Sequence, residues 1–324
     1  MKPFRSCAVL GLLLCAVAVV APSGAAAQSY PAKPVRIILP YLGGADFVGR
    51  LLAAKLTPGL GQQAIVDPRP GAGGNLGHEA VARAAPDGYT LMLASTPFTL
   101  NPILNSRLRY DVERDFAPIS QVATLPNVLA VHPSVPVKSL RELVQLARAN
   151  PGKLAYGSGT AGSTSHLAGE VFRSLTKANI LLVPYKGATF AMVGALSGEV
   201  DFAMPAVSAA LSYAQSKRMR ILAVLDKKRV GALPDVPTSA EAGMPQLLIV
   251  NWYALIAPAG VPQPVMQRLN AETVKVMRSS DIRSRISNIG GEATGTTPEE
   301  AVAFLRAERE RWGKIIRDAG IKAE

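Results

Sequence analysis

Short apolar runs alternate with segments of helical periodicity along most of the chain. After the apolar run Val35–Leu39, for example, Val48, Leu52 and Leu56 recur at the spacing of one helix face. This rhythm predicts an α/β fold, in which each of two lobes is a mostly parallel sheet flanked by helices. The predicted strands are Val35–Leu39, Ala64–Val66, Thr90–Ala94, Val128–Val131, Leu154–Tyr156, Ile180–Val183, Val200–Met204, Arg220–Leu225 and Leu247–Ala257.

Two extended stretches are long enough to cross from one lobe into the other. They are Pro118–His132 and Leu247–Pro258, and together they predict a hinge of two strands that lets the lobes close over a ligand. With such crossings the first lobe is discontinuous, comprising residues 28–126 and 251–324. The second lobe comprises residues 127–250. An organisation of this kind is similar to that of a type II-like periplasmic binding protein.

The C-terminal segment predicts helices without strands. Val265–Met277 has helical periodicity, and Thr297-Pro298-Glu299-Glu300 is a capping box with proline at the first helical position. We expect two final helices that lie as a clasp over one lobe.

The first 27 residues have the three parts of a secretory signal. Lys2 and Arg5 precede an apolar stretch, and Ala25-Ala26-Ala27 offers the small residues of a cleavage site before Gln28. The apolar stretch is short for a membrane span. We therefore predict a cleavable signal peptide and a periplasmic protein.

Charge and cysteine content narrow the function. Removal of Lys2 and Arg5 with the leader lowers the net charge from +12 to +10, but the basic residues are dispersed and aromatic residues are only 6%. This pattern indicates a solvated surface and no nucleic-acid partner. Both cysteines, Cys7 and Cys15, lie in the leader, which excludes disulfides, thiol nucleophiles and iron–sulfur clusters from the mature chain.

Motifs for catalysis are weak. The three histidines, His78, His132 and His166, show no metal-ligand spacing, so we interpret them as structural and expect no metal and no cofactor. There is no G-x-S-x-G elbow and no Walker A loop. Gly157–Gly162 matches G-x-G-x-x-G, but the next strand ends in Pro184-Tyr185-Lys186 without the acid that would bind a ribose, which argues against dinucleotide binding.

The same glycine-rich turn suits a carboxylate. A turn that leads into a helix presents backbone N–H groups and the positive end of the helix dipole, and Ser158, Thr160, Ser163 and Thr164 add hydroxyls. A bland strand-to-helix turn remains the alternative. A second candidate turn, Pro40–Asp46, links the first strand to the first helix, and Ser95-Thr96-Pro97 ends another strand. Asp46 either faces a ligand or caps its helix.

Ordered motifs over essentially the whole mature chain resemble one family, the TctC-like or Bug receptors of tripartite tricarboxylate transporters. The matching segments are Tyr30–Arg36, Arg69–Gly77, Ala85–Leu91, Tyr156–Ser158, His166–Glu170, Val183–Gly187, Pro234–Thr238, Glu241–Gly243 and Ala257–Gly260.

The resemblance implies a two-lobed receptor that encloses a small carboxylate: a di- or tricarboxylate, an acidic amino acid or an aromatic acid. It implies delivery to one large and one small integral membrane subunit, with no chemistry of its own. Family members hold the ligand through main-chain and hydroxyl donors. Carried over, the ligand-binding residues are Tyr41, Gly43, Gly44, Ala45, Asp46 and Thr96 in the first lobe, and Ser158, Gly162, Ser163, Thr164, Tyr185 and Asp201 in the second.

Two other functions stay open at the level of sequence. An exported hydrolase on the same fold would need a nucleophile–base pair, for which Ser163 and His166 are the candidates. A periplasmic sensor that signals to a membrane kinase would have the same binding lobes. Neither the identity of the carboxylate nor the oligomeric state follows from the sequence, although a monomer is expected of a receptor that closes around its cargo.

Overall fold

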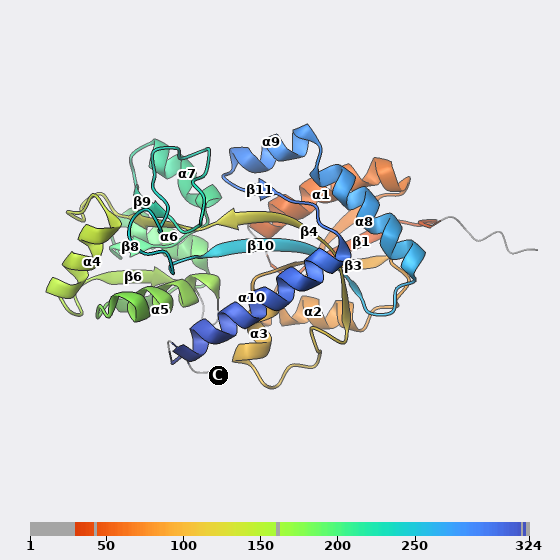
Figure 1. Ribbon diagram of the computed structural model, residues 1–324, viewed down its shortest axis with the longest axis horizontal. Coiled ribbons are helices and arrows are strands. Elements are labelled where there is room, and N and C mark those ends of the chain that lie inside the picture. Colours follow the sequence, from red (N-terminus) through yellow and green to blue (C-terminus); the bar gives the residue numbers. More distant parts are fainter. Residues whose placement is uncertain (1–29, 42–43, 160–162, 319, 322–324) are drawn as a thin grey trace, which may run out of the picture.

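The computed structural model describes residues 30–41, 44–159, 163–318 and 320–321. The predicted signal peptide 1–27 and two predicted ligand residues, Gly43 and Gly162, lie outside these residues. Figure 1 shows two lobes side by side, each with one sheet and its own helices. Below, the first lobe is the six-stranded sheet with its helices, and the second lobe is the five-stranded sheet with its helices.

The first sheet has the strand order β11-β4-β10-β3-β1-β2. Strands β1, β2 and β3 pair in parallel, whereas β10 runs antiparallel between β3 and β4, and β11 runs antiparallel to β4. Four of the six strands therefore point the same way. The bounds are β1 Val35–Leu39, β2 Ala64–Pro68, β3 Thr90–Ser95, β4 Phe116–Pro126, β10 Val250–Pro258 and β11 Glu292–Ala293.

The second sheet has the order β7-β6-β8-β5-β9. Strand β6 pairs in parallel with β7 and β8, and β5 runs antiparallel to both β8 and β9. All strands except β5 therefore share one direction. The bounds are β5 Val128–Val131, β6 Ala155–Ser158, β7 Leu181–Pro184, β8 Phe202–Ala203 and β9 Arg220–Val224.

Helices cover the faces of both sheets, because their apolar residues repeat on one side. In α4, Leu140, Leu143 and Ala147 are buried, and Ser139 caps the helix by accepting a hydrogen bond from the Glu142 N–H at 3.1 Å. The helical segments are α1 Gly44–Leu60, η1 Ala72–Gly74, α2 Asn75–Ala82, α3 Pro97–Leu104, α4 Leu140–Ala149, α5 Thr164–Thr176, α6 Ala188–Ser197, α7 Val207–Gln215, α8 Gln263–Met277, α9 Ser280–Asn288 and α10 Pro298–Asp318.

The chain passes between the sheets where the sequence predicted a crossing. Strand β4 of the first sheet is followed by the single residue Asn127 and then by β5 of the second sheet. On the return, Leu247 and Ile249 are buried in the core of the second lobe, and β10 then enters the first sheet. The predicted fold class, two α/β lobes joined by crossing strands, is confirmed.

Strand directions place particular strand ends between the lobes. Because β4 runs toward the second lobe and β1 and β3 run the same way, β1 and β3 also end on the side of the second lobe. Strand β5 runs away from the first lobe, so β6 and β8, which run opposite to it, end on the side of the first lobe. The carboxyl ends of β1, β3, β6 and β8 therefore point toward the opposite lobe.

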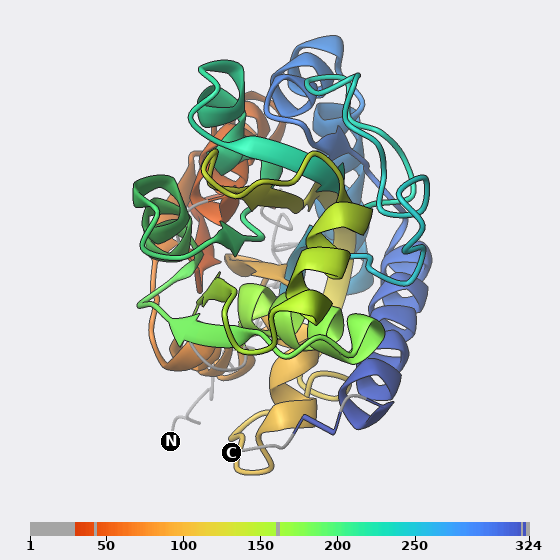
Figure 2. The ribbon, with the colours of Figure 1, turned by 90° about the vertical axis from the view of Figure 1, so that its left-hand side faces the viewer.

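The C-terminal segment differs from the expectation. A further helix, α9, and a short strand, β11, lie between the two predicted helices, and the last helix contacts both lobes. In α10, Leu305 packs in the core of the first lobe with Trp252, whereas Trp312 packs in the core that contains Phe172 of the second lobe. At 21 residues, α10 is roughly 30 Å long, enough to reach past one sheet to the other. Figures 1 and 2 show it running beside both lobes.

The capping box at the start of α10 is confirmed. The Thr297 N–H donates to the Glu300 carboxylate at 2.9 Å, and the Glu300 N–H donates to Thr297 Oγ1 at 3.2 Å. Two backbone donors that an isolated helix start leaves unpaired are thus satisfied.

Candidate functional site

The predicted carboxylate seat of the second lobe lies at the end of β6 and the start of α5. Ser158 is the last residue of β6 and is buried, and its hydroxyl donates to the Gly159 carbonyl at 3.0 Å. Ser163 caps α5 by accepting from the His166 N–H at 3.3 Å, and Thr164 is the buried first residue of the helix. These residues are therefore together, at a strand end that points toward the first lobe.

Two donors of this turn are already used inside the protein. The Gly159 N–H donates to Ser165 Oγ at 2.9 Å, and the His166 N–H is taken by the cap. A Cβ at Gly159 would lie 2.6 Å from Ser165 Oγ, so the close hydroxyl requires glycine here. A ligand carboxylate at this turn would have to use its other donors.

In the first lobe, α1 begins directly against a buried tyrosine. A Cβ added at Gly44 would collide with Tyr253 Oη, and the next residue, Ala45, is buried. Burial raises the pKa of Tyr253 above its ordinary range, so this phenol stays protonated. Tyr253, which the sequence interpretation did not single out, thus lies at the same strand end as the predicted residues.

The carboxylate of Asp46 forms an ion pair with Arg50, one helical turn further along α1. Arg50 Nε lies 3.0 and 2.9 Å from the two carboxylate oxygens of Asp46. Two roles were considered for Asp46, contact with a ligand and capping of the helix. Neither role explains why its carboxylate pairs with Arg50. The guanidinium offsets a negative charge that would otherwise repel an anion at the start of α1.

A buried histidine network lies behind Tyr41. Asn101 Nδ2 donates to the Gly73 carbonyl at 2.9 Å and to Asn75 Oδ1 at 2.7 Å, which identifies the Asn75 atom as an acceptor. Tyr110 Oη donates to the same oxygen at 2.7 Å. The proton shared between Tyr110 Oη and His78 Nδ1, 2.8 Å apart, is therefore carried by His78.

This proton placement determines what Tyr41 can do. With Nδ1 protonated in neutral His78, Nε2 is an acceptor, and Tyr41 Oη donates to it at 2.9 Å. Burial lowers the pKa of His78 to about 3 and raises the pKa of Tyr41, so both groups are neutral at pH 7. Tyr41 keeps only lone pairs for other partners and cannot donate to a ligand carboxylate. His78 is structural, as predicted, and it orients Tyr41.

Two buried polar side chains near the end of β3 have no hydrogen-bond partner in the part of the chain that the structure describes. The two atoms are Thr96 Oγ1 and Trp252 Nε1. Tyr253 pairs with Ser95 across the sheet, so Trp252 and Thr96 each lie one residue from the same strand pair. Buried hydroxyl and indole groups normally bond to something, so this spot suits a water or a polar ligand atom.

The remaining two predicted residues of the second lobe are placed differently. The hydroxyl of Tyr185 is buried against Gly194 of α6, and its pKa is raised by this burial and by the neighbouring Glu199 carboxylate. Asp201 accepts a hydrogen bond from the Ala155 N–H at 2.7 Å, at the start of β6. Ser158 is three residues further along that strand, roughly 10 Å away. Asp201 is therefore not brought together with the turn at Ser158.

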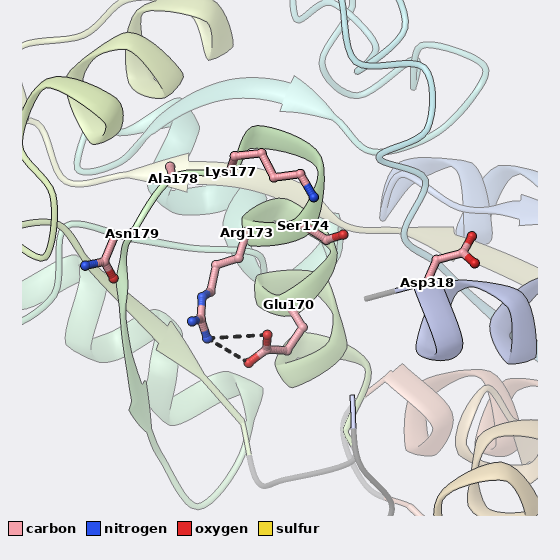
Figure 3. A pocket seen from close by; sticks show the side chains of 7 residues that line it. All are labelled: Glu170, Arg173, Ser174, Lys177, Ala178, Asn179 and Asp318. Carbon is pink, nitrogen blue, oxygen red and sulfur yellow. Dashed lines mark hydrogen bonds and ion pairs between the residues drawn. The ribbon is translucent and has the colours of Figure 1, made fainter. Parts of the chain in front are cut away.

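A surface pocket lies at the other end of α5 (Figure 3). There Arg173 and Glu170 point toward each other, with Nη1 and Oε1 3.2 Å apart, and Asp318 of α10 lines the same pocket. The charges of this pocket are largely paired within the protein. It shares no residue with the predicted carboxylate seat. The lining residues are Glu170, Arg173, Ser174, Lys177, Ala178, Asn179 and Asp318.

The part of the chain that the structure describes contains neither a metal-ligand cluster nor a membrane-spanning helix. Within residues 30–41, 44–159, 163–318 and 320–321, no three histidine, cysteine or acidic side chains lie close enough to hold a metal ion. No helix in these ranges combines the length and the apolar character that crossing a bilayer requires.

Comparison with known proteins agrees with this arrangement. The model of the tripartite tricarboxylate transporter family receptor, TctC, matches residues 48–321. The solved structure "R. palustris Rpa4515 with adipate" is 33% identical, covers 90% of this chain and 99% of its own, and superimposes with a TM-score of 0.84. The periplasmic binding protein BugD is 30% identical, with 91% and 100% coverage and a TM-score of 0.82.

A third structure is MatC from Rhodopseudomonas palustris with bound malate. It is 28% identical, with 89% and 100% coverage and a TM-score of 0.79. The likeness to these proteins thus extends over nearly the whole chain and over both lobes. The chain belongs to the TctC family of tripartite tricarboxylate transporter receptors, which are periplasmic solute-binding proteins and not enzymes.

Proposed function

We propose that the protein captures a small dicarboxylate between its lobes and delivers it to a tripartite membrane transporter. The observation that carries this proposal is the orientation of strand ends. Strands β1, β3 and β6 end toward the opposite lobe, and α1 and α5 begin just beyond β1 and β6. Open α/β proteins bind ligands at such strand ends.

The chemistry of these ends favours an anion with more than one acceptor. The start of α5 offers the positive end of a helix dipole and the Thr164 hydroxyl, without lysine or arginine. In the first lobe, Thr96 Oγ1 is buried and finds no hydrogen-bond partner among the residues that the structure describes. One carboxylate of the ligand would be bound in each lobe, so that a single molecule bridges them.

The bound ligands of two relatives support the ligand class. Rpa4515 was solved with adipate and MatC with malate, and both are dicarboxylates. A bridging dicarboxylate favours the closed arrangement only by as much as it binds that arrangement more tightly than the open one. In this proposal the moving units are residues 28–126 with 251–324 and residues 127–250, and the receptor acts as a monomer.

The ligand is tested by thermal unfolding of the exported form, residues 28–324. Adipate, malate, citrate, glutamate, benzoate and nicotinate are added singly, and a ligand that binds only the folded protein raises the melting temperature. We expect the largest shift from a dicarboxylate. The matched controls are adipamide and malamide, which keep the chain length but carry no charge. Equal shifts from acid and amide would contradict the anion seat.

Delivery is tested separately with membrane vesicles that contain the large and small integral subunits. Uptake of the labelled dicarboxylate should require the ligand-loaded receptor. Uptake at the same rate without the receptor would contradict the delivery role and leave the binding result intact.

A further inference from the structure

A second crevice between the lobes lies behind the hinge strands. Its walls come from β4, from the loop that follows β9, and from the turn between α9 and β11. The first and third of these belong to the first lobe and the second to the second lobe. We name it the rear crevice. It is lined by Thr124, Pro126, Asp226, Lys228, Arg229, Val230, Gly231, Ser287, Gly290, Gly291 and Glu292.

Strand order places the rear crevice across the hinge from the proposed ligand site. In the first sheet β11 lies on one side of β4, while β10, β3 and β1 lie on the other. In the second sheet β9 lies on one side of β5, while β8 and β6 lie on the other. Lys228, just after β9, pairs with Glu292 of β11, so these two edges face each other. The ends of β1, β3 and β6 face each other on the opposite side of the hinge, which we name the front.

The contacts between the lobes across the rear crevice are weak. Lys228 Nζ lies 3.6 Å from Glu292 Oε2, and the two side chains are 77% and 64% exposed. Water screens an exposed pair of this kind, so it contributes little to stability. Gly290 approaches α7 of the second lobe so closely that a Cβ there would lie 2.6 Å from Val207 Cγ1. The lobes thus touch behind the hinge at Gly290 and Val207 and through the ion pair of Lys228 and Glu292.

We propose that the contacts across the rear crevice form a counter-contact that holds the lobes apart on the side of the proposed ligand site. Closure over a ligand then requires these contacts to break, so that the rear crevice widens. The inference rests on the lobe closure of the proposed function. Rotation about strands on the hinge moves the two sides in opposite directions, so whatever opens the rear closes the front. The strength of the counter-contact then sets the closed fraction of the free protein, and with it the ligand affinity.

A wedge in the rear crevice tests the inference. A Cβ built at Gly231 meets no atom within 4 Å, and Gly231 lines the crevice. Gly231→Trp should force the two walls of the rear crevice apart. The free protein should therefore shift toward the arrangement in which the lobes are closed over the ligand site. Gly231→Ala is the matched control, since a methyl group fits the open space. Circular dichroism and urea unfolding establish that both variants fold.

The readout is a distance between spin labels, measured without ligand. Both native cysteines lie in the predicted leader, so labels can be attached at Ile65→Cys on β2 and Leu181→Cys on β7. Both side chains are exposed, and both strands are sheet edges on the front side. Gly231→Trp should move the main distance peak to shorter values. An unchanged or longer distance in the folded variant would overturn the inference.

Charge reversal supplies a second variant that does not alter packing. Glu292→Lys places two cations across the crevice and should also shorten the label distance, less so at high salt. The swap Lys228→Glu/Glu292→Lys should restore the wild-type distance. Glu310→Lys, on an exposed face of α10, is the control for net charge. Equal shortening by Glu292→Lys and by the control Glu310→Lys would contradict a specific role for the pair.

Failure of the two proposals can be told apart. The label distances of the free variants do not depend on any ligand. Adding adipate or malate then reports on the proposed function: if neither shortens the distance in the wild-type protein, the ligand assignment fails while the counter-contact result stands. If both proposals hold, Gly231→Trp should tighten the affinity for the active dicarboxylate severalfold.

Discussion

Asn251 Nδ2 donates a 2.6 Å hydrogen bond to Asn127 Oδ1, linking the two chain segments that run between the lobes. Asn127 is buried, and its Nδ2 donates to the Met204 carbonyl of the second lobe at 2.6 Å. Its own N–H donates to the Ile249 carbonyl at 2.8 Å. Asn127, the one residue between β4 and β5, therefore forms hydrogen bonds that connect the two crossing segments to each other and to the second lobe.

Asn127→Ala should destabilise the protein by about 1–3 kcal/mol, because the Met204 carbonyl and the Asn251 amide lose their partner in a buried place. Asn251→Ala removes only one of these bonds and should cost less. Urea unfolding measures both. Equal losses in the two variants would mean that Asn127 is not the node of the hinge.

Acid should weaken the fold through His78. The pKa of His78 falls from 6.5 to about 3 on burial, so below pH 6.5 the unfolded chain binds a proton that the folded chain does not. This group's stability contribution is fully present above pH 6.5 and is lost at about 1.4 kcal/mol per pH unit as the pH falls toward 3.

The measurement is urea unfolding from pH 7 to pH 4.5 for the wild type and His78→Gln. The variant lacks two ring contacts, with Tyr41 and Tyr110, and should start less stable. Its stability should nevertheless fall less steeply with acid. Parallel pH profiles would show that His78 is not buried in the neutral form.

Thr96→Val should separate stability from binding. The Thr96 hydroxyl is buried without a partner within the described ranges of the chain, so replacing it by a methyl of similar size should stabilise the free protein by about 1 kcal/mol. If the hydroxyl serves the ligand, affinity for the active dicarboxylate should fall in the same variant.

The matched control is Thr99→Val, one turn along α3. Thr99 is also buried, but its hydroxyl donates to the Thr96 carbonyl at 3.0 Å. This variant should lose about 1 kcal/mol and keep its affinity. Calorimetric titration and thermal unfolding of both variants decide the matter, and a stability loss in Thr96→Val would reveal an internal partner for its hydroxyl.

Gly44→Ala should lower stability by about 1–3 kcal/mol, since its new Cβ collides with Tyr253 Oη. Combining it with Tyr253→Phe, which removes that oxygen, should recover most of the loss. Thermal unfolding of the two single variants and the double variant gives the coupling. Additive losses would mean that the strain at Gly44 has another source.

Local patterns predicted the elements and their chain order well. The alternation of apolar runs and helical stripes gave the two sheets, and the Thr297–Glu300 pattern gave the start of α10, because both depend on neighbours in sequence. The extended stretch through Asn127 indicated the crossing, since no turn residues interrupt it. Short α9 and the two-residue β11 carry too few residues to show a period.

The site was less accessible to sequence. Whether Asp201 lies near Ser158 depends on which end of β8 meets which end of β6, and this follows from long-range pairing. The donor state of Tyr41 depends on His78 and Tyr110, 37 and more residues away. No local motif reveals that the hydroxyl of a tyrosine already donates its proton to another residue.

The last helix adds a mechanical condition to any motion of the receptor. Leu305 packs in the core of the first lobe, and Trp312, two helical turns further along, packs in a core that combines Phe172 of the second lobe with Leu100 of α3 in the first. The second half of α10 therefore lies where the two lobes meet, and a swing of the lobes has to move this helix relative to one of them. The travel of the receptor is therefore limited by a tether that belongs to neither crossing strand.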